Sequence, residues 1–189
     1  MTRYRFLALS QPLLLALGLA LPAAAQDALE APLPVLVASS GQALDAFAVQ
    51  TLLTRAGVEV QYDPVATAEK LEGIGTLVLA MGASVKGFGA AGITAETELA
   101  RTQELLDAAE AAGITVIGVH IGGEERRGGL SEQFINLVSS EADALVVWPA
   151  GNADGYFDGV AEQRDIPLFT VDQPMQVGTV LTEQVLDQP

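Results

Sequence analysis

The segments "TLVLAMG" (residues 76–82), "AETELARTQELLDAAEAAG" (95–113) and "ITVIGVHI" (114–121) decide the fold of this chain. The first and the last are short apolar runs, a pattern that is typical of strands buried on both faces of a sheet. Between them, Thr94 has the position of an N-cap, leucines recur at helical spacing, and Gly113 ends the pattern. A strand, a helix and a strand in this order predict a parallel pair, because the helix returns the chain to the edge from which it started.

The same alternation continues in both directions along the chain. It predicts an α/β fold with one doubly wound, mostly parallel sheet of about six strands, a Rossmann-like or flavodoxin-like three-layer sandwich. Residues 26–189 are expected to form this single domain, and Ser131 is expected to cap one of its helices. The further strands are expected at 35–39, 58–62, 142–148 and 166–172, and the further helices at 42–57, 65–73, 130–140, 154–164 and 174–187.

Residues 1–25 have the pattern of a cleavable signal peptide. Arg3 and Arg5 precede an apolar core, and small residues lead to a cleavage point after Ala25. The alternative, an uncleaved membrane anchor, is disfavoured because the unbroken apolar run is shorter than the ~20 residues that a membrane span requires. The sequence therefore predicts an exported, periplasmic protein whose mature part is residues 26–189.

The mature part is strongly acidic. Two of the nine basic residues lie in residues 1–25, so seven remain against all 24 acidic residues, a formal charge of −17. Such a surface repels nucleic acid and anionic lipid, and no nucleic-acid partner is predicted. The chain has no cysteine and a single histidine, so neither a disulfide nor a metal site is predicted.

Four loops are expected at one edge of the sheet, because the carboxyl ends of parallel strands all lie at the same edge. They are residues 39–42, 81–92, 120–129 and 149–157. Together they contain the only histidine, much of the glycine, and three of the seven basic residues of the mature part. In open α/β sheets, ligands bind at this edge near a change in strand order. The sequence therefore predicts a ligand site there.

The predicted ligand is a small polar or anionic solute. Glycines let backbone N–H groups approach a ligand closely, and the helices that follow direct the positive ends of their dipoles towards it. Lys86 and Arg126 would supply positive charge, and the serines and Gln42 would supply hydrogen bonds. The predicted ligand-binding residues are Ser39, Ser40, Gln42, Ser84, Lys86, Gly87, His120, Gly122, Arg126, Arg127 and Asn152.

Each of these assignments has a structural alternative. Glycine-rich turns are common in such folds because tight turns need positive φ. Arg126 and Arg127 follow two glutamates, and pairing among these four at the surface is the alternative to ligand binding. His120 could end a buried strand as a satisfied polar group, and Asn152 could cap a helix.

No cofactor motif is found, and no cofactor is predicted. Gly87 is followed by Phe88, where a phosphate-binding loop has Lys and then Ser or Thr, and the glycines do not have the dinucleotide-fold spacing. Ser84 lies in Gly-x-Ser-x-Lys, which differs from the nucleophile elbow at Lys86. A periplasmic hydrolase or transferase that uses Ser84 and His120 is the second hypothesis. A protein-interaction domain without a small ligand is the third.

The loop sequences "SGQ", "GASVKGFGAAGI" and "GVHIGGEERRG" resemble those of an exported bacterial family, the domain of unknown function 6305. The resemblance extends from about Pro34 to the last predicted strand. It implies an exported single-domain α/β protein whose characteristic residues lie in these loops, among them Lys86, His120, Arg126 and Arg127. It implies no activity.

The size of the mature chain raises a question about how a ligand would be enclosed. A typical solute receptor closes two lobes around its ligand, whereas residues 26–189 provide only one. Binding sites depend on buried ligand surface. A homodimer, or docking onto a membrane transporter, would supply the missing wall.

Overall fold

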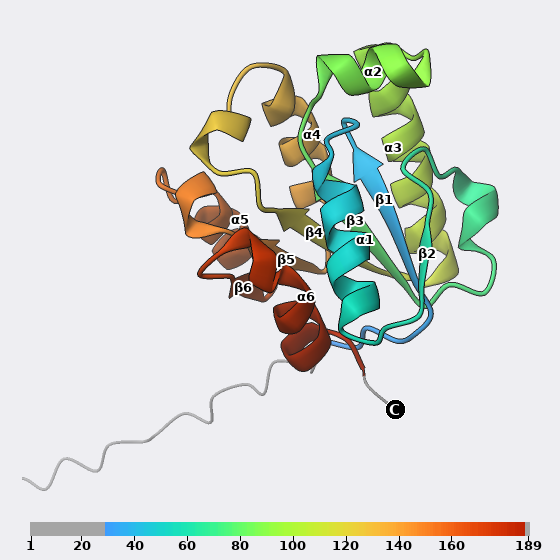
Figure 1. Ribbon diagram of the computed structural model, residues 1–189, viewed down its shortest axis with the longest axis vertical. Coiled ribbons are helices and arrows are strands. Elements are labelled where there is room, and N and C mark those ends of the chain that lie inside the picture. Colours follow the sequence, from blue (N-terminus) through green and yellow to red (C-terminus); the bar gives the residue numbers. More distant parts are fainter. Residues whose placement is uncertain (1–28, 188–189) are drawn as a thin grey trace, which may run out of the picture.

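The computed structural model describes residues 29–187, which fold around one six-stranded sheet (Figure 1). The predicted signal peptide, residues 1–25, lies outside the described residues. Every neighbouring pair of strands is parallel, which confirms the predicted sheet. The strands are β1 (Val35–Ser40), β2 (Val60–Tyr62), β3 (Thr76–Met81), β4 (Thr115–His120), β5 (Ala144–Val147) and β6 (Leu168–Thr170).

The strand order is β2-β1-β3-β4-β5-β6, so the chain begins in the sheet interior and changes direction once. After β2 it crosses over β1 to form β3, and each later strand is added on that side. This is the flavodoxin-like order, one of the two that the sequence left open, and its switch point lies between β1 and β3.

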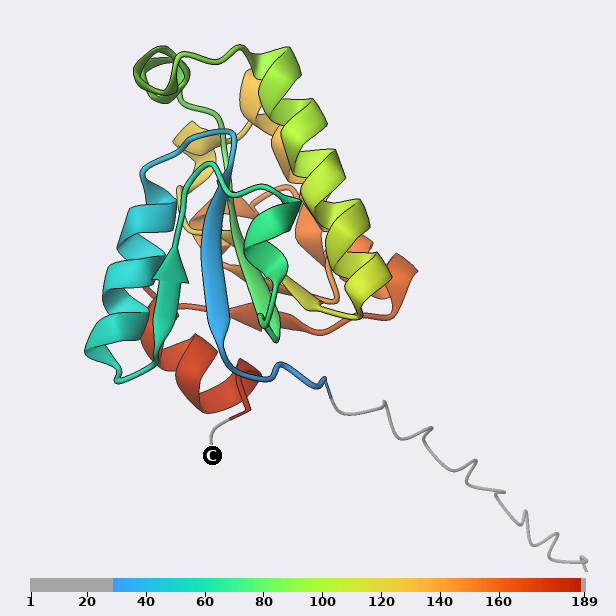
Figure 2. The same cartoon turned by 90° about the vertical axis from the view of Figure 1, so that its right-hand side faces the viewer.

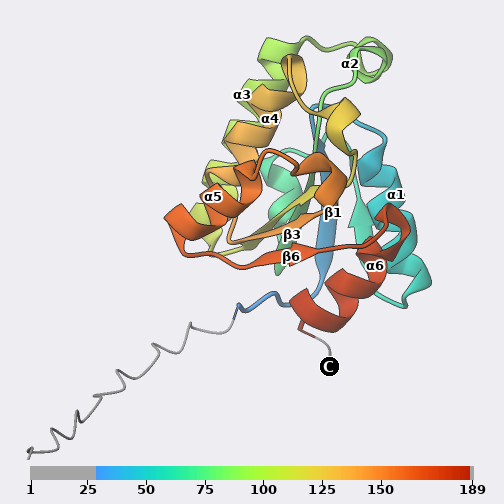
Figure 3. The same ribbon diagram turned by 90° about the vertical axis from the view of Figure 1, so that its left-hand side faces the viewer.

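Helices cover both faces of the sheet, as expected for a three-layer sandwich. Figure 2 shows α1 and α3 on opposite sides of β1, and Figure 3 shows α3, α4 and α5 on one side of the sheet with α1 and α6 on the other. The helices are α1 (Asp45–Arg55), α2 (Val85–Ala91), α3 (Ala95–Ala112), α4 (Leu130–Ser139), α5 (Tyr156–Arg164) and α6 (Val177–Val180). Short turns of other helical types are η1 (Ala68–Leu71), η2 (Glu124–Arg126), η3 (Pro149–Gly151), η4 (Pro174–Gln176) and η5 (Leu181–Val185).

Successive residues of the central strands are buried on opposite faces, which explains their continuous apolar runs. In β1, Val35 and Val37 pack with α1 and the C-terminal helical segment, whereas Leu36 and Ala38 pack under α3 and α4. All six residues of β1 are buried. Two cores, one on each face, therefore stabilise the sheet. Within residues 29–187, no helix combines the length and apolar character needed to cross a bilayer.

Two local predictions were wrong. The loop expected at 81–92 contains the helix α2, although Gly87 and Gly89 lie within it and glycine is a weak helix former. Ser131 does not cap α4, since the cap residue is Gly129. The Ser131 hydroxyl instead accepts a hydrogen bond from the backbone N–H of Ala83, which joins α4 to the end of β3. The predicted cap Thr94 is confirmed at the start of α3.

A buried ion pair joins α3 to the end of β1. Glu98 is fully buried, and its carboxylate accepts hydrogen bonds from Arg101 at 2.8 Å, from the side chain of Gln42 and from the backbone N–H of Gly41. Arg101 also donates to the backbone carbonyls of Ser39 and Ala66. All the charge of this pair is thus compensated within the chain, which is the condition under which a buried pair is tolerated.

We expect Glu98→Gln to lower the free energy of unfolding by about 3 kcal/mol, because it leaves the Arg101 guanidinium without its counter-charge in a mostly buried site. Urea denaturation measures the change. The matched control is Glu96→Gln, two residues earlier at an exposed position of the same helix, where about 0.5 kcal/mol or less is expected. Equal effects of the two substitutions would show that the buried network adds no more to the free energy of unfolding than an exposed carboxylate does.

Candidate functional site

The switch point between β1 and β3 is closed by the chain itself. The backbone N–H of Gly82 donates to the carbonyl of Ser40 at 3.0 Å, and that of Ser84 donates to the carbonyl of Gly41 at 2.8 Å. Gln42 and Ala83 form a short antiparallel bridge. The loops that follow the two strands are therefore hydrogen-bonded to each other at the position where a flavodoxin-like fold presents its crevice.

The glycine-rich loop packs closely against the loop after β1. A Cβ atom added to Gly87 would lie 2.3 Å from the carbonyl oxygen of Gln42, closer than any real side chain approaches. The Ser84 hydroxyl accepts a hydrogen bond from the N–H of Gly87 and so caps α2, and Gln42 Nε2 donates to the carbonyl of Pro64 and to Glu98. The polar side chains of Gln42 and Ser84, both predicted to bind a ligand, thus have partners within the chain.

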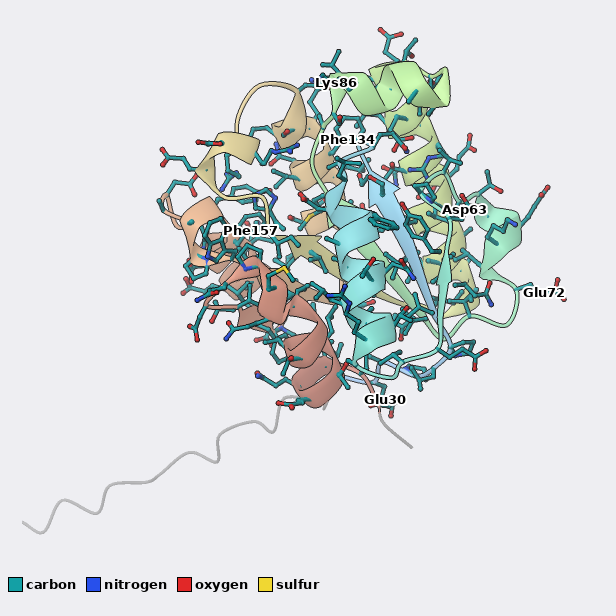
Figure 4. All side chains as sticks on the ribbon, viewed as in Figure 1. Glu30, Asp63, Glu72, Lys86, Phe134 and Phe157 are labelled. Atoms are coloured by element: carbon teal, nitrogen blue, oxygen red, sulfur yellow. The ribbon has the colours of Figure 1, made fainter. Side chains whose placement is uncertain are left out.

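The two predicted cations, Lys86 and Arg126, are exposed. Figure 4 shows Lys86 on α2, at the outer end of the molecule. The aliphatic part of Arg126 packs against Gly122, where an added Cβ would lie 2.5 Å from Arg126 Cγ. Neither cation forms an ion pair with another described residue.

Arg127 and Asn152 have structural partners. The Arg127 guanidinium donates to Glu132 at 2.8 Å, to Asp154 at 3.1 Å and to the carbonyl of Gly151 at 2.7 Å. Asn152 accepts from the backbone N–H of Phe157 and donates to Asp158 near the start of α5. Both residues hold the β5–α5 loop in place, which is the structural alternative that the sequence left open for Asn152.

His120, the last residue of β4, is fully buried. Its ring stacks on Phe157 with centroids 5.5 Å apart, and Nδ1 lies 3.2 Å from the carbonyl oxygen of Met81. Burial lowers the pKa of His120 below its ordinary 6.5, against the opposing effects of the Met81 and Gly123 carbonyls and Asp45. The ring is therefore neutral near pH 7. Because a carbonyl only accepts, the hydrogen bond to Met81 is formed by the tautomer with its proton on Nδ1, and that tautomer leaves Nε2 as a hydrogen-bond acceptor.

Three buried polar atoms at this edge have no hydrogen-bond partner among the described residues: His120 Nε2, Asp45 Oδ2 and Ser40 Oγ. Ser40 is paired with Met81, and His120 follows Val119, whose partner Ala80 precedes Met81. The side chains of Ser40 and His120 therefore point to the same face of the sheet, on strands that β3 separates. Asp45 begins α1, and its Oδ2 lies 3.3 Å from the position of a Cβ added to Gly122. Burial raises the pKa of the Asp45 carboxyl, although Arg126 and His120 oppose that effect. Ser39 Oγ is a fourth unpartnered atom at this edge, and it points to the face of the sheet covered by α1, the helix that begins at Asp45.

The sequence reading missed Asp45, Glu98 and Arg101. Asp45 was placed within a helix, and Glu98 was assigned only to the helix dipole. An acidic residue at the first position of the helix after β1 was the available signal for Asp45, because that position lies at the carboxyl edge. Nothing in the sequence pattern indicates that Glu98 is buried.

A cleft with a volume of about 390 Å³ lies beside His120. Gly151 forms the wall between them, since a Cβ added there would lie 2.7 Å from His120 Nε2. The lining carries three carboxylates and one guanidinium, so the cleft is acidic. Its lining residues are Glu124, Arg127, Gly128, Glu132, Ala150, Gly151, Ala153 and Asp154. A cleft of about 480 Å³ lies at the opposite edge of the sheet, near Glu30 and Arg164.

The described part of the chain offers no group of three or more histidine, aspartate or glutamate side chains placed to hold a metal ion. The unpartnered atoms instead suit hydrogen-bond donors. The imidazole Nε2 is an acceptor, the Asp45 carboxyl oxygen is an acceptor in the ionised form, and the serine hydroxyl can both donate and accept.

Comparison with known proteins gives a family match and distant structural similarities, of which two are described here. The model of the family described as "Domain of unknown function (DUF6305)" matches residues 32–185. None of the curated proteins matches the chain. A GDSL-like lipase from Bacteroides thetaiotaomicron has 12% sequence identity and a TM-score of 0.34, and the match covers 72% of this chain and 66% of the lipase, just under two thirds of its length. A mutant of the esterase AlinE4 has 11% identity and a TM-score of 0.30, with 87% of this chain and 85% of the esterase covered.

We expect Gly87→Ala to lower the free energy of unfolding by about 1–3 kcal/mol, because the added methyl group would collide with the Gln42 carbonyl. Thermal or urea unfolding measures the loss. Gly89→Ala in the same helix is the matched control, since its Cβ would meet nothing within 4 Å and alanine favours helix. If Gly87→Ala were as stable as the control, the loop would be open and not closely packed.

His120 is the only histidine of the chain, so its titration can be followed by NMR without ambiguity. We expect a midpoint below 6.5, the ordinary value. The unfolded chain then binds more protons than the folded one just below pH 6.5, and the free energy of unfolding decreases as the pH falls from 6.5 through the folded pKa.

The variant Asp45→Asn tests the electrostatic coupling between the side chains of Asp45 and His120. It removes the negative charge that favours the imidazolium form, so the midpoint of His120 should fall further. A midpoint at or above 6.5 in the unmodified protein would contradict the buried, neutral ring.

Proposed function

The chain belongs to the DUF6305 family, and from the geometry of its own residues we propose that it binds a small polar solute at the carboxyl edge of the sheet. The observation that carries this proposal is the set of buried polar atoms without partners, His120 Nε2, Asp45 Oδ2 and Ser40 Oγ. Buried polar groups in folded proteins are nearly always hydrogen-bonded, so these atoms favour a polar guest.

The donor and acceptor pattern favours one class of ligand. Nε2 and the carboxylate oxygen both accept, so the fitting group is a donor, such as the hydroxyl of a polyol or sugar, or an amine. An anion would meet two acceptors and the carboxylates of the neighbouring cleft. The cations near it would be Arg126, close to Asp45, and Arg127, which is already paired with Glu132 and Asp154. The sequence predicted a small polar or anionic solute, and the geometry favours the polar solute over the anion.

Access to His120 depends on the η3 segment. Gly151 separates the ring from the cleft, and the backbone of Pro149–Gly151 must shift for a solute in the cleft to reach Nε2. A shift of this segment breaks the hydrogen bond from Arg127 to the Gly151 carbonyl. Arg127 keeps Glu132 as its partner in that state.

The predicted export signal supports a periplasmic setting for this binding. There, a one-lobed receptor would present its solute to a membrane transporter or to a second subunit. A hydrolase is not proposed, because the Ser84 hydroxyl caps α2 and His120 Nδ1 faces a backbone carbonyl and not a carboxylate.

We expect the melting temperature of the purified protein, measured with polyols, sugars, amines and small anions, to rise most with a neutral or cationic ligand that donates hydrogen bonds. A ligand at 100 times its Kd adds about 2.7 kcal/mol to the free energy of unfolding. The increase should vanish in His120→Phe, which keeps the aromatic stack on Phe157 but removes the Nε2 acceptor.

The control is Lys86→Ala, which changes an exposed cation outside the cluster and should leave the increase intact. A stabilising anion whose effect is lost in Lys86→Ala and kept in His120→Phe would overturn the proposal in favour of a surface anion site. A panel without any stabilising donor would also count against it.

A further inference from the structure

The acidic cleft beside His120 lies between two turns that follow neighbouring strands. The turn η2 follows β4 and the turn η3 follows β5 (Figure 1). The two turns pack on each other, since a Cβ added to Gly151 would lie 3.4 Å from the Cα of Gly123. Gly151 also separates the cleft from Nε2 of the fully buried His120, an acceptor without a partner among the described residues. A solute that reaches this acceptor past Gly151 would therefore extend into the cleft.

Arg127, the one cation in the lining, has no donor left for a ligand. Its Nε donates to Glu132 at 2.8 Å, and its Nη1 donates to the carbonyl of Gly151 at 2.7 Å and to Asp154 at 3.2 Å. Its Nη2 donates to Asp154 at 3.1 Å and to Glu132 at 3.5 Å. These contacts use all five N–H groups of the guanidinium, which also lies 5.0 Å from the centroid of the Tyr156 ring. Arg127 therefore holds the loop together and does not offer a binding group to an anion.

The charge that remains in the cleft is negative. The lining has one guanidinium against three carboxylates, so its formal charge is −2. Arg127 is paired with Glu132 and Asp154, whereas Glu124 is exposed and forms no ion pair with another residue of 29–187. A group of carboxylates at a surface is not by itself a binding site. Here the buried acceptor of His120, behind Gly151, is the independent observation that favours a ligand at this position.

The side chains of the cleft and His120 offer hydrogen-bond acceptors only, and this distinguishes between the polar ligands. A primary ammonium group carries three N–H donors and no acceptor. A hydroxyl group carries one donor and two lone pairs, so a polyol would bring further acceptors to carboxylate oxygens. The ammonium also carries the charge that a negative cleft attracts. An amine therefore fits this position better than a polyol or a sugar.

We propose that the solute is a small cationic amine with a second donor group, such as an amino alcohol or a diamine. Its ammonium group lies in the cleft beside Glu124 and Asp154, and its other donor reaches His120 Nε2 past Gly151. This inference rests on the proposed solute site and names the class of its ligand. Glu124, whose charge is not compensated within the chain, is the residue that selects a cation.

Isothermal titration calorimetry of the purified protein with three matched probes tests the ligand class. The probes are diaminobutane, aminobutanol and butanediol, which carry two, one and no ammonium groups on the same carbon chain. We expect both amines to bind about tenfold or more tightly than the diol, because the diol lacks the charge that the cleft attracts. Amine binding should weaken as salt is raised, whereas diol binding should not change.

The variant Glu124→Gln tests the residue that selects the cation. It should weaken the binding of both amines about fivefold, the effect of an exposed ion pair, and leave the diol unchanged. The matched control is Glu125→Gln, which removes the same charge from the next residue, also exposed but outside the lining of the cleft. This control should leave the binding of all three probes nearly unchanged. Because both positions are exposed, neither substitution removes a buried contact.

The outcomes separate this inference from the proposed solute site. A diol that binds as tightly as the amines, or equal effects of Glu124→Gln and Glu125→Gln, would overturn the amine assignment and leave the solute site intact. The same conclusion would follow if neither amine bound and a sugar stabilised the protein through His120. Amine binding that is weakened in Glu124→Gln but unchanged in His120→Phe would overturn the solute site at His120, and with it the two-ended ligand.

Discussion

The buried Glu98–Arg101 pair is the interaction on which the carboxyl edge of the sheet depends. It connects three segments that are distant in the sequence: the end of β1, the loop after β2 and the first turns of α3. A carboxylate without solvent contact is costly unless every lone pair is used, and here Gly41, Gln42 and Arg101 all donate to it. The backbone that follows β1 is held where it can bond to the loop after β3.

In this arrangement the glycines of the loop after β3 have a different role from the one that the sequence predicts. In the sequence they indicate an open, ligand-facing turn. In the structure Gly87 allows α2 to lie against the backbone of Gln42, and Gly41 approaches the carbonyl of Gly82 in the same way. The switch point is therefore closed by the chain. Unpartnered polar atoms remain there at Ser39 and Ser40, and others lie at Asp45 and, further along the edge, at His120.

The site prediction named an edge of the sheet and a set of side chains, and the structure shows which of those side chains already have partners within the chain. The rule that ligands bind at strand ends directed attention to the loops that hold His120, Ser40 and Gly122. It could not distinguish a free side chain from one already in use, because hydrogen bonds such as Arg127 to Asp154 or Asn152 to Asp158 depend on loop conformation. Sequence spacing does not determine that conformation. Asp45 and the exposed Phe47 both lie in a helix whose burial pattern depends on packing against two different neighbours.

The sequence by itself determined the α/β alternation, the parallel sheet, the start of α3 at Thr94 and its end at Gly113, because apolar periodicity and capping are local properties. It also determined the family, through the loop sequences, and the acidic character of the chain. Only the tertiary structure decided the strand order, the burial of Glu98 and the closure of the switch point. These depend on contacts between residues far apart in the chain, such as Gly41 with Glu98, whose free energy is gained only when the whole sheet is assembled.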